Sequence, residues 1–184
     1  MIELITVMIV IGILSALGVS RFFSRETFDA KEYADQAKAV MRYAQKLAIA
    51  QNRPIYVSAT ADRFAACTAA NCGVSALVPA PGGSNSGGTE TQAQCLAGGN
   101  YISNWMCEGR LSSVSVASSR TTEAGAASSY FIFDSMGRPY NKADTVAAAG
   151  QPSTSTFSQA LTLTFSGAGV SYTVTVEPET GYVH

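Results

Sequence analysis

The sequence predicts an α+β fold in which a long N-terminal helix packs on an antiparallel β-sheet head. Three patterns support this prediction. Residues 4–20 contain no ionisable side chain, and residues 33–48 carry an apolar stripe with helical spacing. Residues 161–176 alternate apolar and polar side chains in two short runs that are joined by a glycine-containing turn.

The chain has 184 residues, which is the length of one domain with a terminal extension. We expect a stem helix over residues 1–21, followed by the amphipathic half of the same helix over residues 22–53. A β-rich head then covers residues 54–184, long enough for one small hydrophobic core. Within the head, residues 67–107 hold all four cysteines and form a loop region.

The apolar run at the N-terminus carries a single charge, Glu3, and ends at Arg21. A helix of about 20 residues spans roughly the 30 Å hydrocarbon core of a bilayer. A carboxylate inside such a helix costs free energy unless it is paired, so Glu3 is a candidate functional residue whose partner lies outside this chain. The acid precedes the apolar core and no basic segment precedes it, unlike a cleaved signal peptide. A plain single-pass anchor, with Glu3 at the membrane surface, is the alternative interpretation.

The pattern after Arg21 predicts that the helix continues with one apolar face. The stripe consists of residues at i, i+3, i+4 and i+7 spacing: Tyr33, Ala37, Val40, Met41, Ala44, Leu47 and Ala48. The segment Asn52-Arg53-Pro54 ends the helix, because proline cannot continue it and the residue before proline favours extended geometry.

The rest of the chain has strand and turn signals. Residues 55–60 and 63–67 predict one hairpin, and residues 161–176 predict another with its turn at 167–169. Residues 130–133 predict a strand that ends in a turn at 134–137. A weaker strand is predicted around Leu111, Val114 and Val116, and residues 81–92 are predicted to be a Gly/Ser-rich loop.

Four cysteines allow three disulfide pairings. We expect Cys67–Cys72 and Cys95–Cys107, which would close two local loops and indicate an oxidising compartment. The alternative is a metal site with all four thiolates as ligands. Only the first pair has the close spacing that structural zinc sites favour, so the disulfides are the preferred interpretation.

Composition and motifs disfavour an enzyme. The only histidine is His184, and there is no phosphate-binding loop, dinucleotide fingerprint or HExxH motif, so we expect neither a catalytic site nor a cofactor. Asp134 and Glu177 follow predicted strands and are expected to be turn or cap residues, and Trp105 is expected to anchor a loop. The net charge of −1 disfavours nucleic acid as a partner.

The first residues resemble the class III signal and stem helix of type IV pilins and type II secretion pseudopilins. Mature chains of that family usually begin Phe-Thr-Leu-Ile-Glu-Leu, and Met1-Ile2-Glu3-Leu4 aligns with its last four positions. Glu3 takes the place of the family's acid. We expect the chain to lack two preceding residues, an N-methylated Phe and a Thr in relatives, and a Gly-terminated basic leader. It is then either a trimmed mature chain or one whose start is misplaced.

Parts of the head carry a finer resemblance. Residues 43–57, 133–141 and 173–184 are similar to a subgroup of minor pilins and minor pseudopilins that includes the FimT-like proteins. Residues 20–37 are similar to minor pilins of the mannose-sensitive haemagglutinin pilus. The resemblance therefore implies the type IV pilin fold.

The resemblance implies a structural subunit of a type IV pilus or pilus-like filament that serves adhesion, motility or surface attachment. The subunit would first sit in the bacterial inner membrane with its head in the periplasm. Its partners would be homologous pilin subunits, an inner-membrane assembly platform and the lipid bilayer. Its final location would be an extracellular pilus or a periplasmic pseudopilus. Glu3 would neutralise a neighbour's N-terminal amine.

Two alternatives are a minor pseudopilin of a type II secretion system and a DNA-uptake minor pilin. The acidic C-terminal segment, residues 176–184, disfavours the DNA-uptake function, which would need a basic patch.

Overall fold

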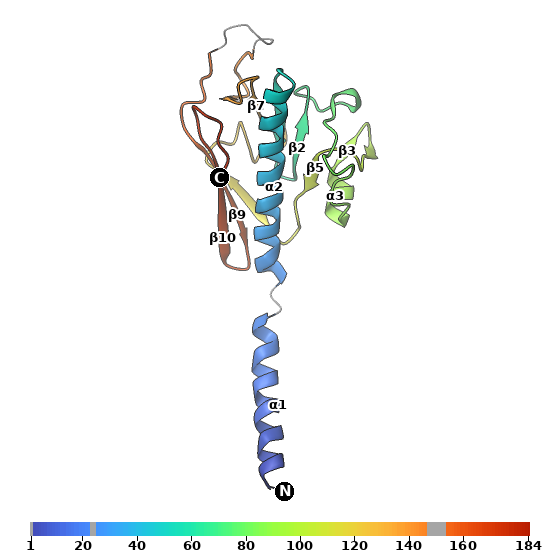
Figure 1. Ribbon diagram of the computed structural model, residues 1–184, viewed down its shortest axis with the longest axis vertical. Helices are drawn as coiled ribbons and strands as arrows, with labels where there is room; N and C mark the ends of the chain where they lie inside the picture. Colours follow the sequence, from blue (N-terminus) through green and yellow to red (C-terminus); the bar gives the residue numbers. More distant parts are fainter. Residues whose placement is uncertain (1, 23–24, 147–153) are drawn as a thin grey trace.

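The molecule is elongated, with one helix projecting from a head made of a second helix and antiparallel strands (Figure 1). The computed structural model describes residues 2–22, 25–146 and 154–184. Helix α1 covers Ile2–Phe22 and helix α2 covers Arg25–Ala50. The single continuous helix predicted from the sequence is therefore seen as two described segments, and its junction at residues 23–24 lies outside the described residues.

Helix α2 buries the predicted apolar stripe and ends where the sequence indicates. Six of the seven stripe residues are fully buried or nearly so, and Leu47 packs against them while partly exposed. At the C-terminus, the Arg53 amide donates to the Ala48 carbonyl at 3.2 Å, and the Asn52 amide donates to the Ile49 carbonyl. Asn52 has a positive φ of 49°, as expected for the residue after a helix in this capping motif.

The larger sheet has five antiparallel strands in the order β5-β2-β1-β7-β8. The predicted first hairpin is confirmed, because β1 pairs with β2. Strand β7 pairs with the other edge of β1. The strands are β1 (Ile55–Ala59), β2 (Arg63–Cys67), β5 (Cys107–Gly109), β7 (Tyr130–Phe133) and β8 (Pro139–Tyr140).

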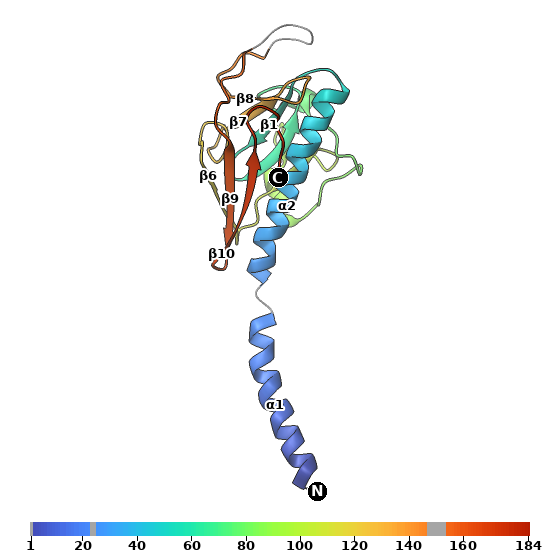
Figure 2. The same ribbon diagram turned by 60° about the vertical axis from the view of Figure 1, so that its left-hand side comes forward.

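The smaller sheet has three antiparallel strands in the order β10-β9-β6 and contains the second predicted hairpin (Figure 2). The strands are β6 (Ser115–Ser118), β9 (Leu161–Gly167) and β10 (Val170–Val176). Ala168 and Gly169 at the β9–β10 turn both have positive φ, 48° and 78°, which matches the right-handed twist of a hairpin. Of the weaker strand predicted around Leu111, Val114 and Val116, only Val116 lies in β6.

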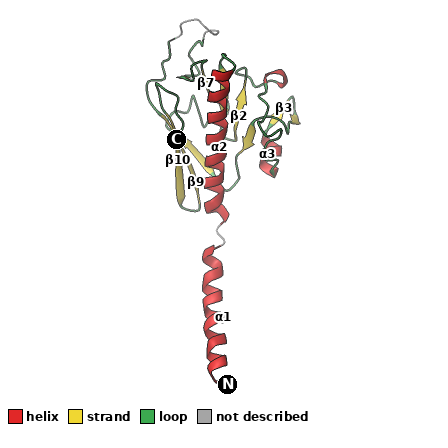
Figure 3. Ribbon diagram, viewed as in Figure 1, coloured by secondary structure: helices red, strands yellow, loops and turns green. Residues whose placement is uncertain are grey.

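The hydrophobic core lies between α2 and the inner faces of both sheets (Figure 3). In Figure 1 the three-stranded sheet lies on one side of α2, and β2 and β5 lie on the other. The ring of Tyr33 on α2 contacts Phe64 of the larger sheet, at 6.0 Å between centroids, and Phe165 of the smaller sheet, at 5.6 Å. One helix therefore joins two separate sheets into one core.

The cysteine-containing region packs on the outer face of the larger sheet. It contains a 3-10 turn (Val74–Ala76), helix α3 (Thr89–Gln94), β3 (Leu96–Ala97) and β4 (Asn100–Tyr101). Helix α3 shortens the predicted 81–92 loop. Thr91, which lies within this predicted loop, is buried, and its hydroxyl accepts a hydrogen bond from the Gly109 amide at 3.1 Å. The loop interpretation missed this because a six-residue polar helix has no apolar periodicity.

The C-terminal segment is fixed to α2 by two side chains. Arg42 donates to the Val183 carbonyl at 2.9 Å, and Gln45 donates to the carbonyls of Gly137 and Thr180, each at 2.9 Å. Gly181 has φ of 65°, and a Cβ there would lie 2.2 Å from the Gly137 carbonyl oxygen. A glycine is therefore required where the two turns approach.

Candidate assembly surface

Helix α1 presents apolar side chains on all sides. The described side chains of this helix, residues 2–15, are all exposed. Ten of them are large and apolar, with exposed fractions from 52% at Val7 to 82% at Ile2. A helix that is apolar all round is stable only when lipid or other protein surrounds it.

The number of exposed apolar side chains gives an estimate of the free energy that burial of this surface would contribute. Burying one large apolar side chain contributes about 1.5–3 kcal/mol, so full burial of ten corresponds to roughly 15–30 kcal/mol before the entropy of association. Exposed apolar patches of this extent mark sites of contact with proteins or membranes. The helix is therefore a binding surface that the head does not cover.

Among the described residues, none of the helices has both the length and the apolar content needed to cross a lipid bilayer.

Glu3 lies in the first turn of α1 and is exposed. The Thr6 hydroxyl donates to the Glu3 backbone carbonyl at 2.9 Å, so it does not engage the carboxylate. Within the described residues, the carboxylate has no hydrogen-bond or ion-pair partner. An acid at the start of a helix is favoured by the helix dipole, although that effect accounts for only a few tenths to about 1 kcal/mol. A partner for the Glu3 carboxylate therefore lies outside the described residues.

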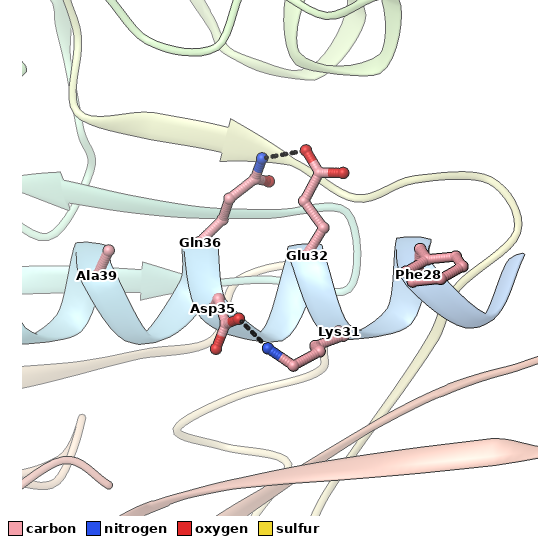
Figure 4. A pocket seen from close by; sticks show the side chains of 6 residues that line it. All are labelled: Phe28, Lys31, Glu32, Asp35, Gln36 and Ala39. Atoms are coloured by element: carbon pink, nitrogen blue, oxygen red, sulfur yellow. Dashed lines mark hydrogen bonds and ion pairs between the residues drawn. The ribbon is translucent and has the colours of Figure 1, made fainter. Parts of the chain in front are cut away.

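The exposed side of α2 carries a shallow groove with a volume of about 500 Å³. Figure 4 shows its lining side chains. Two pairs satisfy most of its polar groups: Lys31 donates to Asp35 at 3.0 Å, and Gln36 donates to Glu32 at 3.2 Å. Phe28 is 69% exposed on the same side. The groove thus offers an exposed aromatic ring at one end of a row of polar side chains that pair with one another.

Phe28 was not singled out in the sequence, because the predicted stripe starts at Tyr33 and buries the opposite side of α2. The sequence nevertheless indicates that Phe28 is unusual, because it is an apolar residue on a charged helix face. Phe28 and Ala39 lie three turns apart on the face that also carries Lys31 and Asp35.

The four cysteines form two disulfides, Cys67–Cys72 and Cys95–Cys107, with Cα–Cα distances of 5.3 and 5.9 Å. They belong to a small second core around Trp105. The Trp105 indole is fully buried and donates to the Ala66 carbonyl at 2.9 Å. Both the cysteines and Trp105 therefore hold the loop region on the larger sheet.

The polar residues considered as chemical candidates have structural partners. Asp134 accepts from the Met136 and Arg138 amides and from the Arg138 guanidinium, all within its turn. The His184 ring lies 2.9 Å from the Glu177 carboxylate. Among the described residues, no three His, Cys, Asp or Glu side chains are grouped so that they could hold a metal ion.

The sequence matches no protein-family model and no curated protein. Comparison with solved structures finds the type IV minor pilin FimU of Pseudomonas aeruginosa strain PAO1 in two crystal forms. The first crystal form has 11% sequence identity and a TM-score of 0.46, and the match covers 84% of this chain and 90% of FimU. The second has 12% identity and a TM-score of 0.48, and the match covers 86% of this chain and 89% of FimU. The minor pseudopilin EpsH of the Vibrio cholerae type 2 secretion system has 12% identity and a TM-score of 0.48, covering 85% of this chain and 94% of EpsH.

Proposed function

We propose that the chain is a structural subunit of a type IV pilus or pilus-like filament, which it joins through its N-terminal helix. The observation that carries this proposal is α1 itself. It is apolar on every side, has one acid in its first turn and projects from a head whose core is already complete. Such a helix fits a bundle of like helices, each burying its neighbours' apolar surface.

The proposed role of Glu3 is to set the axial position of the subunit. Inside a helix bundle the dielectric is low, so an unpaired carboxylate is costly and its attraction to a positive charge is strong. A neighbouring subunit's N-terminal amine supplies that charge. Because the pair forms at one axial offset only, the electrostatic interaction selects one register among the many that the apolar surface allows.

The proposal divides the chain into the three parts expected from the sequence. Residues 1–21 form the filament stem, residues 22–53 form the amphipathic half of the N-terminal helical region, which packs on the strands, and residues 54–184 form the β-rich part of the head. Before assembly, residues 4–20 sit in the bacterial inner membrane with the head in the periplasm, where the two disulfides form. An inner-membrane assembly platform then transfers the subunit into an extracellular pilus or a periplasmic pseudopilus.

The same stem supports a second candidate, a minor pseudopilin of a type II secretion system. Counting the copies of this chain in purified surface filaments would separate a pilus subunit from a pseudopilin. A DNA-uptake pilin is disfavoured, since the C-terminal segment carries Glu177 and Glu179 and its one histidine faces Glu177. Nucleic-acid binding needs an excess of positive charge there.

Two substitutions at Glu3 test the proposed function. Glu3→Ala and Glu3→Gln should leave membrane insertion intact, since each removes the only charge from the apolar run. Both should lower incorporation into filaments severely, because the neighbour's buried amine loses its counter-charge, a loss of about 3–5 kcal/mol. The measurement is the ratio of this chain in sheared filaments to that in the membrane.

Glu3→Gln is the sharper variant, because it keeps the shape of the side chain and one acceptor oxygen while removing its charge. Glu179→Gln makes the same chemical change at an exposed position of the head and serves as the matched control. If Glu3→Gln enters filaments as well as the wild type does at equal membrane abundance, the chain is better described as a plain membrane anchor.

A further inference from the structure

A small polar pocket lies on the face of the larger sheet that points away from α2. Side chains alternate along β1, so Val57 faces the core while Ser58 faces this pocket. The walls come from the Cys67–Cys72 loop, which contributes Asn71, and from the segment before β7, which contributes Ser128. The volume is about 260 Å³, below the usual range for drug-sized ligands and suited to a single small ring.

The charge in this pocket is entirely positive. Its lining includes Arg63 and Lys142 and no aspartate or glutamate. The Lys142 ammonium donates to the Ser128 backbone carbonyl at 2.6 Å and lies 5.2 Å from the centre of the Tyr130 ring. Among the described residues it has no carboxylate partner, so the lysine is held at the pocket by neutral groups. An anionic ligand would complete its pairing.

Arg63 adds a second, partly desolvated charge. One terminal nitrogen of its guanidinium donates to the Gln94 carbonyl at 2.7 Å, and the group lies 5.1 Å from the centre of the Trp105 ring. Its Nε is buried with no hydrogen-bond partner among the described residues. Burial lowers the pKa of Arg63 below its ordinary value, and the Asp62 carboxylate offsets this effect only in part. A ligand carboxylate beside the unpartnered Nε would add further compensation for the positive charge.

The remaining lining groups are mostly hydroxyls and amides. Ser58 is the most informative, since it is only 7% exposed and lines the pocket. Among the described residues, the side-chain atoms that are both buried and without a hydrogen-bond partner are the Tyr33 hydroxyl and the Arg63 Nε, so the Ser58 hydroxyl is open to the pocket, where it can bond to a ligand. Ser128 and the Asn71 amide add further hydrogen-bonding groups at the walls. This combination suits a ligand that carries several hydroxyls as well as a negative charge.

We propose that this pocket binds a carboxylated saccharide unit. The carboxylate would pair with Lys142 and Arg63, and the sugar hydroxyls would bond to Ser58, Asn71 and Ser128. The proposed filament function does not require such a site, because the pocket is formed by head residues and lies away from α1 and from the exposed side of α2. It would let the subunit attach to acidic polysaccharides.

The test is ligand-observed NMR with the full-length chain in micelles of a zwitterionic detergent that contains no sugar. Sodium glucuronate is the probe. Glucose represents its sugar hydroxyls without the carboxylate, and acetate represents its carboxylate without the sugar. We expect glucuronate to bind with a Kd in the millimolar range and both glucose and acetate to bind at least about tenfold more weakly. A glucuronate Kd above about 10 mM, or equal binding of glucose or acetate, would overturn the proposal.

Three variants locate the binding site. Lys142→Met should weaken glucuronate binding about tenfold or more, because it removes a charged hydrogen bond. Ser58→Ala should weaken glucuronate binding about fivefold, because it removes a neutral hydrogen bond. Lys46→Met removes a charge from the exposed side of α2 and should change nothing. Trp105 fluorescence confirms that each variant is folded. Unchanged binding in folded Lys142→Met would place the saccharide elsewhere and reject this pocket, whatever the outcome of the filament experiment.

Discussion

The hydroxyl of Tyr33 offers a test of how α2 joins the two sheets. The residue is fully buried in contact with Phe64 and Phe165, and its hydroxyl has no hydrogen-bond partner among the described residues. Removing an unsatisfied buried polar group while keeping the ring relieves its desolvation cost. Tyr33→Phe should therefore raise the free energy of unfolding by about 1 kcal/mol at pH 7.

The same substitution should change the alkaline pH dependence. Burial raises the pKa of Tyr33 well above its ordinary value, with Asp62 and Glu108 adding to the rise and Arg110 opposing it. Above about pH 10 the unfolded chain loses this proton and the folded chain keeps it, so wild-type stability falls as pH rises. This loss is about 1.4 kcal/mol at pH 11. The advantage of Tyr33→Phe should therefore grow from about 1 to about 2.4 kcal/mol.

Urea unfolding of a chain truncated to residues 23–184 measures both effects, with the fluorescence of buried Trp105 as the probe. Tyr101→Phe is the matched control, since the Tyr101 hydroxyl donates to Asn85. That variant should lose about 1 kcal/mol. The reasoning fails if Tyr33→Phe lowers the free energy of unfolding as much as Tyr101→Phe does. It also fails if the stability advantage of Tyr33→Phe over the wild type does not grow with pH, since either result would mean that the Tyr33 hydroxyl is hydrogen-bonded.

Three further predictions concern the head. Residues 23–184 should form a soluble monomer, because the stripe of α2 is already covered by the sheets; aggregation under oxidising conditions would show that the boundary is misplaced. Non-reducing peptide mapping of the exported protein should recover Cys67–Cys72 and Cys95–Cys107, and free thiols or a 67–95 link would contradict this pairing. Gly181→Ala should lower the free energy of unfolding by more than about 1 kcal/mol in the same urea assay, and an unchanged value would mean that the two turns separate easily.

The sequence predicted those parts of the head whose signals are local. The stripe of α2 and the β9–β10 hairpin each follow one periodicity over many residues, and each was placed within a few residues. The two disulfides also close short loops, so spacing alone favoured their pairing. What these features share is that neighbours in sequence determine them.

The missed features depend on contacts between distant segments. Strands β3, β4 and β5 have two or three residues each, too few for any periodicity to be recognised. The division of the strands into three sheets, of five, three and two strands, is set by which edges meet, and nothing in a single strand encodes that. The pocket around Ser58 and Lys142 combines four segments of the chain, so no local motif could indicate it.

The contacts of α2 have a consequence for when the head can fold. A growing chain emerges from the ribosome N-terminus first, so α2 appears early, while β9 and β10, which cover part of its stripe, appear much later. The carbonyls bound by Arg42 and Gln45 include those of Val183 and Thr180, which lie 141 and 135 residues later in the chain. Until these arrive, the apolar stripe has only part of its cover, and such incomplete chains are prone to aggregate. Helix α2 therefore lacks its full cover until the chain up to Val183 has left the ribosome, and the head cannot reach its final structure before then.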